Sequence, residues 1–139
     1  MELTAHWEGG YRVRVPVRGF VIVSDEPPQY GGTDEGPTPT ELLLSSLAVC
    51  FTMAVAYAFR KNGVELPDLA VRASADYEGL RLSRFRLHVH SSHPRQEIEA
   101  LMDQAKSYCF VSNTLLGLPE IEYAVAEGPL MPSQAASTS

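Results

Sequence analysis

Two cysteines, Cys50 and Cys109, are the residues of this chain best suited to chemistry. Two cysteines in 139 residues are too few for a disulfide scaffold. Residues 1–4 lack the charged and apolar regions of a secretory signal, so we expect a cytoplasmic protein. In that compartment a cysteine pair favours catalysis or redox sensing. The alternative is two unrelated buried thiols, because free cysteine is among the most buried residue types.

Cys50 lies inside a long apolar segment that is predicted to be helical. Thr38 can cap the helix, a proline follows it, and Glu41 stands where a capping box and the positive helix end favour an acid. Residues 42–59 are apolar on nearly every side, and a basic turn with Gly63 ends the segment. Cys50 is therefore expected deep in a buried helix.

The length of this helix bears on how it is covered. A helix over residues 40–62 spans roughly 33 Å at about 1.5 Å per residue. Such a segment could cross a membrane by length, but Ala, Ser and Thr dilute it and the rest of the chain is amphipathic. We therefore expect no membrane span. A domain of 139 residues does not easily wrap such a helix, so we expect a second subunit to bury it.

The remaining pattern predicts an α+β fold, because strands and helices come in separate blocks. One domain is expected over residues 1–127, followed by a C-terminal tail over 128–139. A long loop rich in glycine and proline is expected over 25–39. The predicted strands cover residues 2–7, 11–15, 20–23, 69–77, 84–90 and 121–125, with a second helix from 92 to about 108 and a helical turn over 112–116.

Other classes of site find little support. A net charge of −6 and a pI near 5.1 argue against a nucleic-acid partner. His88 and His90 share a predicted strand face with Arg84 and Arg86, which favours a solvated face over a metal site. The sequence has no glycine-rich phosphate loop and no metal-ligand spacing. We therefore expect no metal and no bound cofactor.

Two motifs in the chain resemble the signatures of a known protein family. Residues 36–44 (GPTPTELLL) with residues 47–52 (LAVCFT) resemble the first signature of the OsmC/Ohr family, in which a proline-acidic helix start precedes a cysteine. Residues 107–115 (SYCFVSNTL) resemble the second, in which a cysteine is followed by Pro-Val-Ser. The predicted order of elements is similar to the family fold from about residue 2 to residue 126.

This resemblance implies an intertwined homodimer, with an antiparallel sheet, a long helix buried at its centre and a site at the subunit interface. It implies a thiol-dependent peroxidase that reduces organic hydroperoxides in antioxidant defence and the stress response. Cys50 would attack the peroxide, and Cys109 would resolve the sulfenic acid as a disulfide. A lipoyl-type dithiol such as dihydrolipoamide would then reduce that disulfide. Glu41 is the candidate for the catalytic acid of this pattern.

The chain departs from the peroxidase pattern in its arginines. In that pattern an arginine in the N-terminal strands or in the loop before the long helix activates the thiolate. The loop over residues 25–39 contains none. Arg12, Arg14 and Arg18 are candidates by their place in the N-terminal strands.

Two further positions depart from the pattern. The catalytic glutamate commonly follows the proline directly, where this chain has Thr40, and Phe110 stands where the second motif has proline. The alternative function is therefore a catalytically reduced protein that binds an apolar ligand or senses oxidants at the dimer interface.

Overall fold

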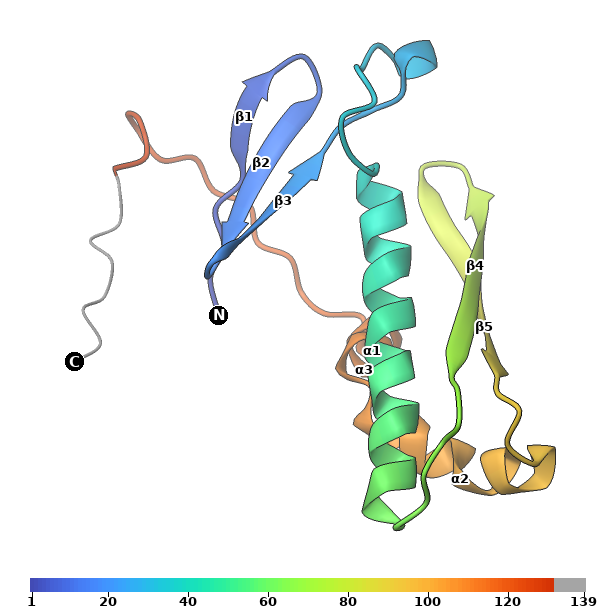
Figure 1. Cartoon of the computed structure of the whole chain (residues 1–139). Coiled ribbons are helices and arrows are strands. Elements are labelled where there is room, and N and C mark those ends of the chain that lie inside the picture. Colours follow the sequence, from blue (N-terminus) through green and yellow to red (C-terminus); the bar gives the residue numbers. More distant parts are fainter. Residues whose placement is uncertain (132–139) are drawn as a thin grey trace.

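A computed structural model describes residues 1–131 as two antiparallel sheets and three α-helices (Figure 1). The predicted α+β class is confirmed. The expected tail over 128–139 lies outside the described residues from position 132 onward. The elements in chain order are β1 (His6–Gly9), β2 (Arg12–Val17), β3 (Phe20–Ser24), the 3-10 turn η1 (Pro28–Tyr30), α1 (Pro39–Lys61), β4 (Ala70–Glu78), β5 (Arg81–His90), α2 (Arg95–Tyr108) and α3 (Phe110–Gly117).

The first three strands form a meander in the order β1-β2-β3. Its first strand begins at His6, four residues later than the sequence pattern suggested. The predicted end of the second strand at residue 15 is wrong, because β2 continues to Val17 and Pro16 pairs in register with Val21. The chain instead turns at Arg18, which has a positive φ of 55°. Proline is tolerated in a strand where its nitrogen has no ladder bond to donate.

The remaining elements, β4, β5, α2 and α3, form a second part of the structure around helix α1. Helix α1 lies at its centre, as predicted. Its buried residues recur at helical spacing and pack with Ala105 of α2 and with Cys109. The β4–β5 hairpin and α2 both pack against α1 (Figure 1). The α1 residues that contribute to this core are Leu47, Phe51, Ala54, Val55, Ala58 and Phe59.

The strand predicted over residues 121–125 is wrong, because the structure has no strand there. Ile121, Tyr123 and Val125 alternate as in a strand but are 68%, 90% and 99% exposed. A strand needs a neighbour to complete its backbone hydrogen bonds, and no other strand of the described chain pairs with this segment. The expected helical turn at 112–116 is instead a helix of eight residues, α3.

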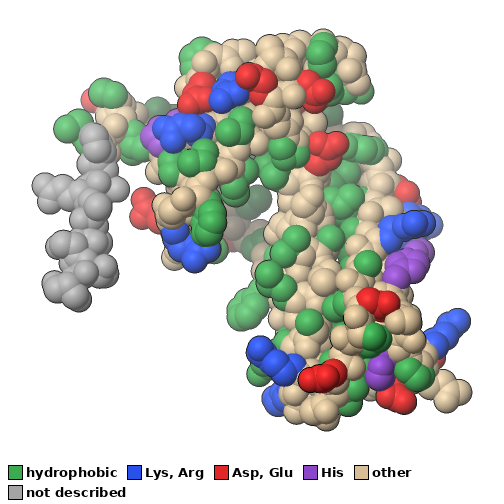
Figure 2. Space-filling model, viewed as in Figure 1, with side chains coloured by type: hydrophobic (Ala, Val, Ile, Leu, Met, Phe, Trp, Pro, Cys, Tyr) green, Lys and Arg blue, Asp and Glu red, His purple; other side chains and the backbone are tan. Residues whose placement is uncertain are grey.

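Many apolar side chains are exposed to solvent rather than packed against other parts of the described chain. On α1, Val49, Met53 and Tyr57 are 53%, 67% and 41% exposed and lie opposite the core-facing residues. Phe20 and Trp7 are exposed on the N-terminal sheet. Hydrophobic side chains accordingly appear on the surface of both parts of the molecule (Figure 2). We name the α1 residues Val49, Met53 and Tyr57 the open stripe.

By length and composition α1 could cross a membrane, with a mean hydropathy of 2.1 over its most apolar window. The core helix of a globular protein meets the same criterion. One third of that window is buried within the described chain.

Candidate active site

Cys50 is positioned by the start of α1. The Glu41 N–H donates to the Thr38 hydroxyl over 3.3 Å, and the Thr38 N–H donates to the Glu41 carboxylate over 2.8 Å. This is the predicted capping box, which satisfies two N–H groups that the helix cannot. The helix then continues without interruption to Lys61. Cys50 lies near its middle, partly buried, at the edge between the core-facing residues and the open stripe.

Cys109 is the single residue between two helices. It is extended (φ −83°, ψ 97°), so it ends α2 and precedes α3. Its N–H donates to the Lys106 carbonyl, and its own carbonyl accepts from the Asn113 N–H. Its side chain is fully buried in the core that α1 forms, and Cys50 packs against that same core. The fold therefore brings the two predicted cysteines to one core, and both are free thiols.

The three arginine candidates lie on the N-terminal sheet. Arg12 binds the carboxylates of Glu8 and Glu35 at 2.8 and 2.9 Å, and Arg14 binds Glu8 at 2.9 Å. Arg18 lies over the ring of Phe20, 5.3 Å from its centre. Carboxylates and an aromatic ring thus occupy all three guanidinium groups, and none of these contacts is with a cysteine.

Glu41 is engaged in the cap rather than free. It precedes Cys50 by nine residues, which is about 13.5 Å along a helix at about 1.5 Å per residue. Its carboxylate accepts the Thr38 N–H. Within one chain the structure therefore keeps Glu41 apart from Cys50, and its predicted catalytic role remains a prediction.

A cluster of polar and aromatic side chains around Tyr108 was not predicted from the sequence. The Tyr108 hydroxyl accepts hydrogen bonds from Gln104 Nε2 at 3.0 Å and from Lys61 Nζ at 3.1 Å. These donors stabilise the phenolate, so the pKa of Tyr108 is lowered by Gln104 and then by Lys61. The Tyr108 ring also meets Tyr57 edge to face, with centroids 4.8 Å apart. The sequence signal was a tyrosine beside Cys109 with Gln104 one helical turn earlier.

The loop before α1 is organised by a second group that the sequence analysis missed. Asp25 is 1% exposed. Its carboxylate accepts the N–H groups of Glu26, Thr33 and Glu35 and the hydroxyl of Thr33. These hydrogen bonds, the Thr33 hydroxyl foremost, lower the pKa of Asp25 to about 2. A polar loop of this length is thus held in one conformation next to the helix that carries Cys50.

The loop also contains a close approach of backbone to backbone. A Cβ on Gly32 would lie 1.7 Å from the carbonyl oxygen of Glu26. Only glycine fits there without moving the loop. The hydrogen bonds to Asp25 therefore hold the loop, and Gly32 permits the close backbone contact that this conformation requires.

A family model described as OsmC-like protein matches residues 32–124. The match includes both cysteines and all three helices. The chain belongs to the OsmC-like family. No curated protein matches the sequence.

Solved structures share the fold of this OsmC-like protein at low sequence identity. The OsmC-like protein of Mycoplasma pneumoniae aligns with a TM-score of 0.73 and 23% identity, over 84% of this chain and 87% of that one. An organic hydroperoxide resistance protein OsmC of Legionella pneumophila gives 0.65 and 22%, over 84% and 88%. An organic hydroperoxide resistance protein of Elizabethkingia anophelis gives 0.58 and 19%, over 82% and 88%. At such identities the likeness concerns the fold.

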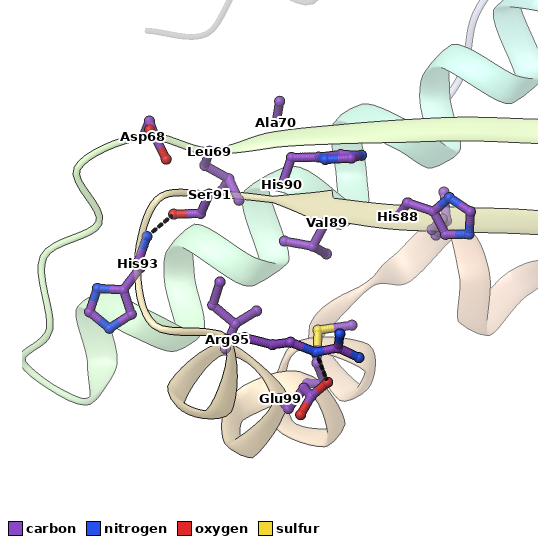
Figure 3. Close-up of a pocket in the computed structure, with 13 residues that line it drawn as sticks. Asp68, Leu69, Ala70, His88, Val89, His90, Ser91, His93, Arg95 and Glu99 are labelled. Carbon is purple, nitrogen blue, oxygen red and sulfur yellow. Dashed lines mark hydrogen bonds and ion pairs between the residues drawn. The ribbon is translucent and has the colours of Figure 1, made fainter.

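A cleft of this OsmC-like protein lies away from its cysteines. It has a volume of about 800 Å³ and runs between β5 and α2, where His88, His90 and Arg95 are among the labelled side chains (Figure 3). Neither cysteine lines it. Within residues 1–131, no group of three His, Cys, Asp or Glu side chains could hold a metal ion. His88 and His90 are exposed, as the strand pattern predicted.

A smaller, more apolar pocket lies at the start of α1. It has a volume of about 530 Å³ and is lined on one side by the tip of the β4–β5 hairpin. Thr40 on the helix and Tyr77 on the hairpin join across it through their hydroxyls, 3.1 Å apart. Leu43 lines it from α1. Leu43 precedes Cys50 by seven residues, so the two lie on nearly the same helix face.

Proposed function

We propose that this OsmC-like protein reduces organic hydroperoxides with Cys50 as the attacking thiol and Cys109 as the resolving thiol. The observation that carries the proposal is the placement of two free thiols on one core, Cys50 partly accessible and Cys109 fully buried. The hydroperoxide resistance in the names of the Legionella and Elizabethkingia proteins supports it.

The chemistry proceeds in three balanced steps. The Cys50 thiolate attacks the terminal oxygen of the hydroperoxide; the O–O bond breaks, and the alkoxide takes a proton and leaves as an alcohol. Cys50 is then a sulfenic acid, which the Cys109 thiol converts to a Cys50–Cys109 disulfide with release of water. A dithiol such as dihydrolipoamide reduces this disulfide by exchange and is itself oxidised to a cyclic disulfide.

The burial of Cys109 suits the resolving role. A thiolate needs access to its peroxide substrate, whereas a resolving thiol needs access only to the sulfenic acid. Cys109 is 0% exposed and Cys50 is partly exposed. The difference in exposure therefore favours Cys50 as the residue that meets the peroxide.

We propose further that the working unit is a homodimer. The chain exposes 11159 Å², against about 7,100 Å² for a compact monomer of its mass. The eight C-terminal residues would account for at most about 1,100 Å² of the excess even if extended. The remainder is about 3,000 Å² per chain, or about 6,000 Å² for two chains, which lies at the upper end of the total area that obligate dimers bury. The open stripe on α1 and the strand-like segment over 121–125 are the surfaces that a second copy would cover.

A dimer would also complete the site. Within one chain Arg12, Arg14 and Arg18 make their contacts on the N-terminal sheet. The open stripe borders Cys50, so a second subunit on this stripe would approach the sulfur. We propose that the cation that favours the thiolate is supplied across this interface.

The test is turnover of cumene hydroperoxide with reduced lipoamide. Cys50→Ser should abolish peroxide consumption. Cys109→Ser should permit one turnover and then accumulate overoxidised Cys50, measured by intact-protein mass spectrometry. Absence of turnover in the unmodified protein, with Cys50 unreactive towards peroxide, would sink the proposal. Equal activity in both variants would contradict the separate roles.

The second candidate is a protein that binds an apolar ligand or senses oxidants without efficient turnover. The observation that favours it is the pocket formed by Leu43, Leu80 and Leu82 at the start of α1. Saturable binding of an alkyl ligand that Leu43→Asp abolishes, in a protein without turnover, would decide for it.

A further inference from the structure

Tyr108 joins the ends of two helices beside the resolving cysteine. Lys61, the last residue of α1, donates to its hydroxyl over 3.1 Å, and Gln104 of α2 donates to the same oxygen over 3.0 Å. Lys61 Nζ also lies 5.4 Å from the centre of the Tyr108 ring. The next residue along the chain is Cys109.

The network continues into α1. Asn62 donates to the Gln104 side-chain oxygen over 2.8 Å and to the Ala58 carbonyl over 2.7 Å. Gln104 thus links the C-terminal cap of α1 to Tyr108 through both ends of its amide. Because one end fixes the other, the Gln104 amide group has a defined orientation towards the Tyr108 hydroxyl. We name Lys61, Asn62, Gln104 and Tyr108 the tyrosine clamp.

The ring of Tyr108 docks on the helix face that carries Cys50. Tyr57 meets that ring edge to face, with a centroid distance of 4.8 Å and an interplanar angle of 79°. Tyr57 follows Cys50 by seven residues, and seven residues fall about 20° short of two full turns. The clamp therefore attaches the chain immediately before Cys109 to the side of α1 on which Cys50 lies.

Cys109 depends on this attachment because the backbone is not helical there. Its extended conformation interrupts the helical hydrogen bonds between α2 and α3. The direction of its side chain is consequently set by what holds the two helix ends. The clamp holds the α2 end, and the Ser112 hydroxyl bond to the Cys109 carbonyl, at 3.2 Å, holds the α3 end.

We propose that Tyr108 is a positioning residue for the resolving step, which keeps Cys109 directed at the sulfenic acid of Cys50. The proposal rests on the proposed peroxidase function. The step that it controls joins the Cys109 sulfur to the Cys50 sulfur, breaks the S–O bond and releases water. A second hydroperoxide competes for the same sulfenic acid and oxidises it to sulfinic acid. Tyr108 thus determines how much peroxide the protein tolerates.

The main test is Tyr108→Phe, which removes the hydroxyl and keeps the ring against Tyr57. Disulfide formation after one equivalent of cumene hydroperoxide should slow about fivefold, as expected if the two hydrogen bonds from Gln104 and Lys61 are lost and each lies at the low end of the usual net contribution. The peroxide concentration that overoxidises half of Cys50 should fall by the same factor, because resolution is unimolecular and overoxidation is not. The rate at which the first sulfenic acid forms should not change. Tyr30→Phe, at an exposed tyrosine, is the matched control.

Two variants of Lys61 separate positioning from simple stabilisation. Lys61→Met removes one donor and should lower the overoxidation midpoint, whereas Lys61→Arg keeps a donor and should restore most of it. A purely structural role would lower the thermal unfolding midpoint and leave the ratio of resolution to overoxidation unchanged. An unchanged ratio in Tyr108→Phe would overturn the inference.

A third measurement keeps the inference distinct from the proposed function. Diamide oxidises two nearby thiols to a disulfide and is itself reduced to a hydrazine, so it needs no peroxidase activity. Slower formation of the Cys50–Cys109 disulfide in Tyr108→Phe would support the clamp even if the unmodified protein consumed no hydroperoxide. Equal rates in the two proteins would refute it.

Discussion

The start of α1 offers a direct test of what Glu41 does. Its carboxylate closes the capping box with Thr38, yet the family resemblance also makes it a candidate acid. Three substitutions separate these roles. Glu41→Gln keeps an oxygen that can accept the Thr38 N–H, Glu41→Ala removes it, and Thr38→Ala removes the other half of the box without touching a carboxylate.

The expected losses of stability follow from the two bonds. Thr38→Ala should cost about 1 kcal/mol of unfolding free energy, as typical N-caps do. Glu41→Ala should cost about 1.5 kcal/mol, since it loses the 2.8 Å bond and the favourable charge at the helix start. Glu41→Gln loses only the charge, at about 0.5 kcal/mol. At about 4 °C per kcal/mol, these values correspond to Tm decreases of about 4, 6 and 2 °C.

The assays are thermal unfolding and hydroperoxide turnover on the same preparations. If Glu41 acts through the helix start, Glu41→Gln should keep kcat/KM within about threefold of the unmodified protein. Glu41→Ala and Thr38→Ala should then change kcat/KM by similar factors, because both variants break the same capping box. The reasoning fails if Glu41→Gln lowers kcat/KM by about 100-fold or more, as loss of an acid–base group does, while its Tm changes by about 2 °C.

Three further outcomes are expected. The pKa of Asp25 is about 2 in the folded protein against an ordinary value of 3.8. Its contribution to stability is therefore complete above the unfolded pKa and is lost as the pH falls through the folded pKa. The Tm measured against pH should fall between about pH 4 and pH 2, and this fall should be absent in Asp25→Asn. Gly32→Ala should lower Tm and expose the loop to proteolysis, whereas Gly19→Ala, where a Cβ meets no atom within 4 Å, should do neither; equal Tm values would contradict the loop geometry. Met53→Asp on the open stripe should convert dimer to monomer in sedimentation, whereas Gln96→Asp on the exposed side of α2 should not; a monomeric unmodified protein would refute the dimer.

Much of the fold follows from local sequence pattern. The long helix, its capping box and the basic turn at its end are encoded in neighbouring residues, because propensity and capping act over a few positions. The β4 and β5 strands likewise follow from alternation. The predicted strand over 121–125 has the same alternation and does not form, since pairing depends on a neighbour that the described chain does not provide.

The candidate site was predictable in its sulfurs and not in their surroundings. Cys50 and Cys109 follow from residue type and motif, which are properties of the sequence itself. The role of Asp25 could not be predicted, because no sequence pattern in the loop indicates that three backbone N–H groups and a hydroxyl donate to one carboxylate. The arginine candidates were chosen by proximity in sequence, and the fold pairs Arg12 with Glu8 and Glu35 instead.

The sequence by itself determined the chemistry available to this protein: two thiols, no disulfide framework, and a helix able to hold one thiol at its centre. It determined these because residue identity and short-range periodicity are local properties. Only the tertiary structure decided that Cys109 is buried while Cys50 is partly open, and that Tyr108 is held by Lys61 and Gln104 beside it. Burial and long-range hydrogen bonds depend on how distant segments pack, and no spacing along the chain specifies that.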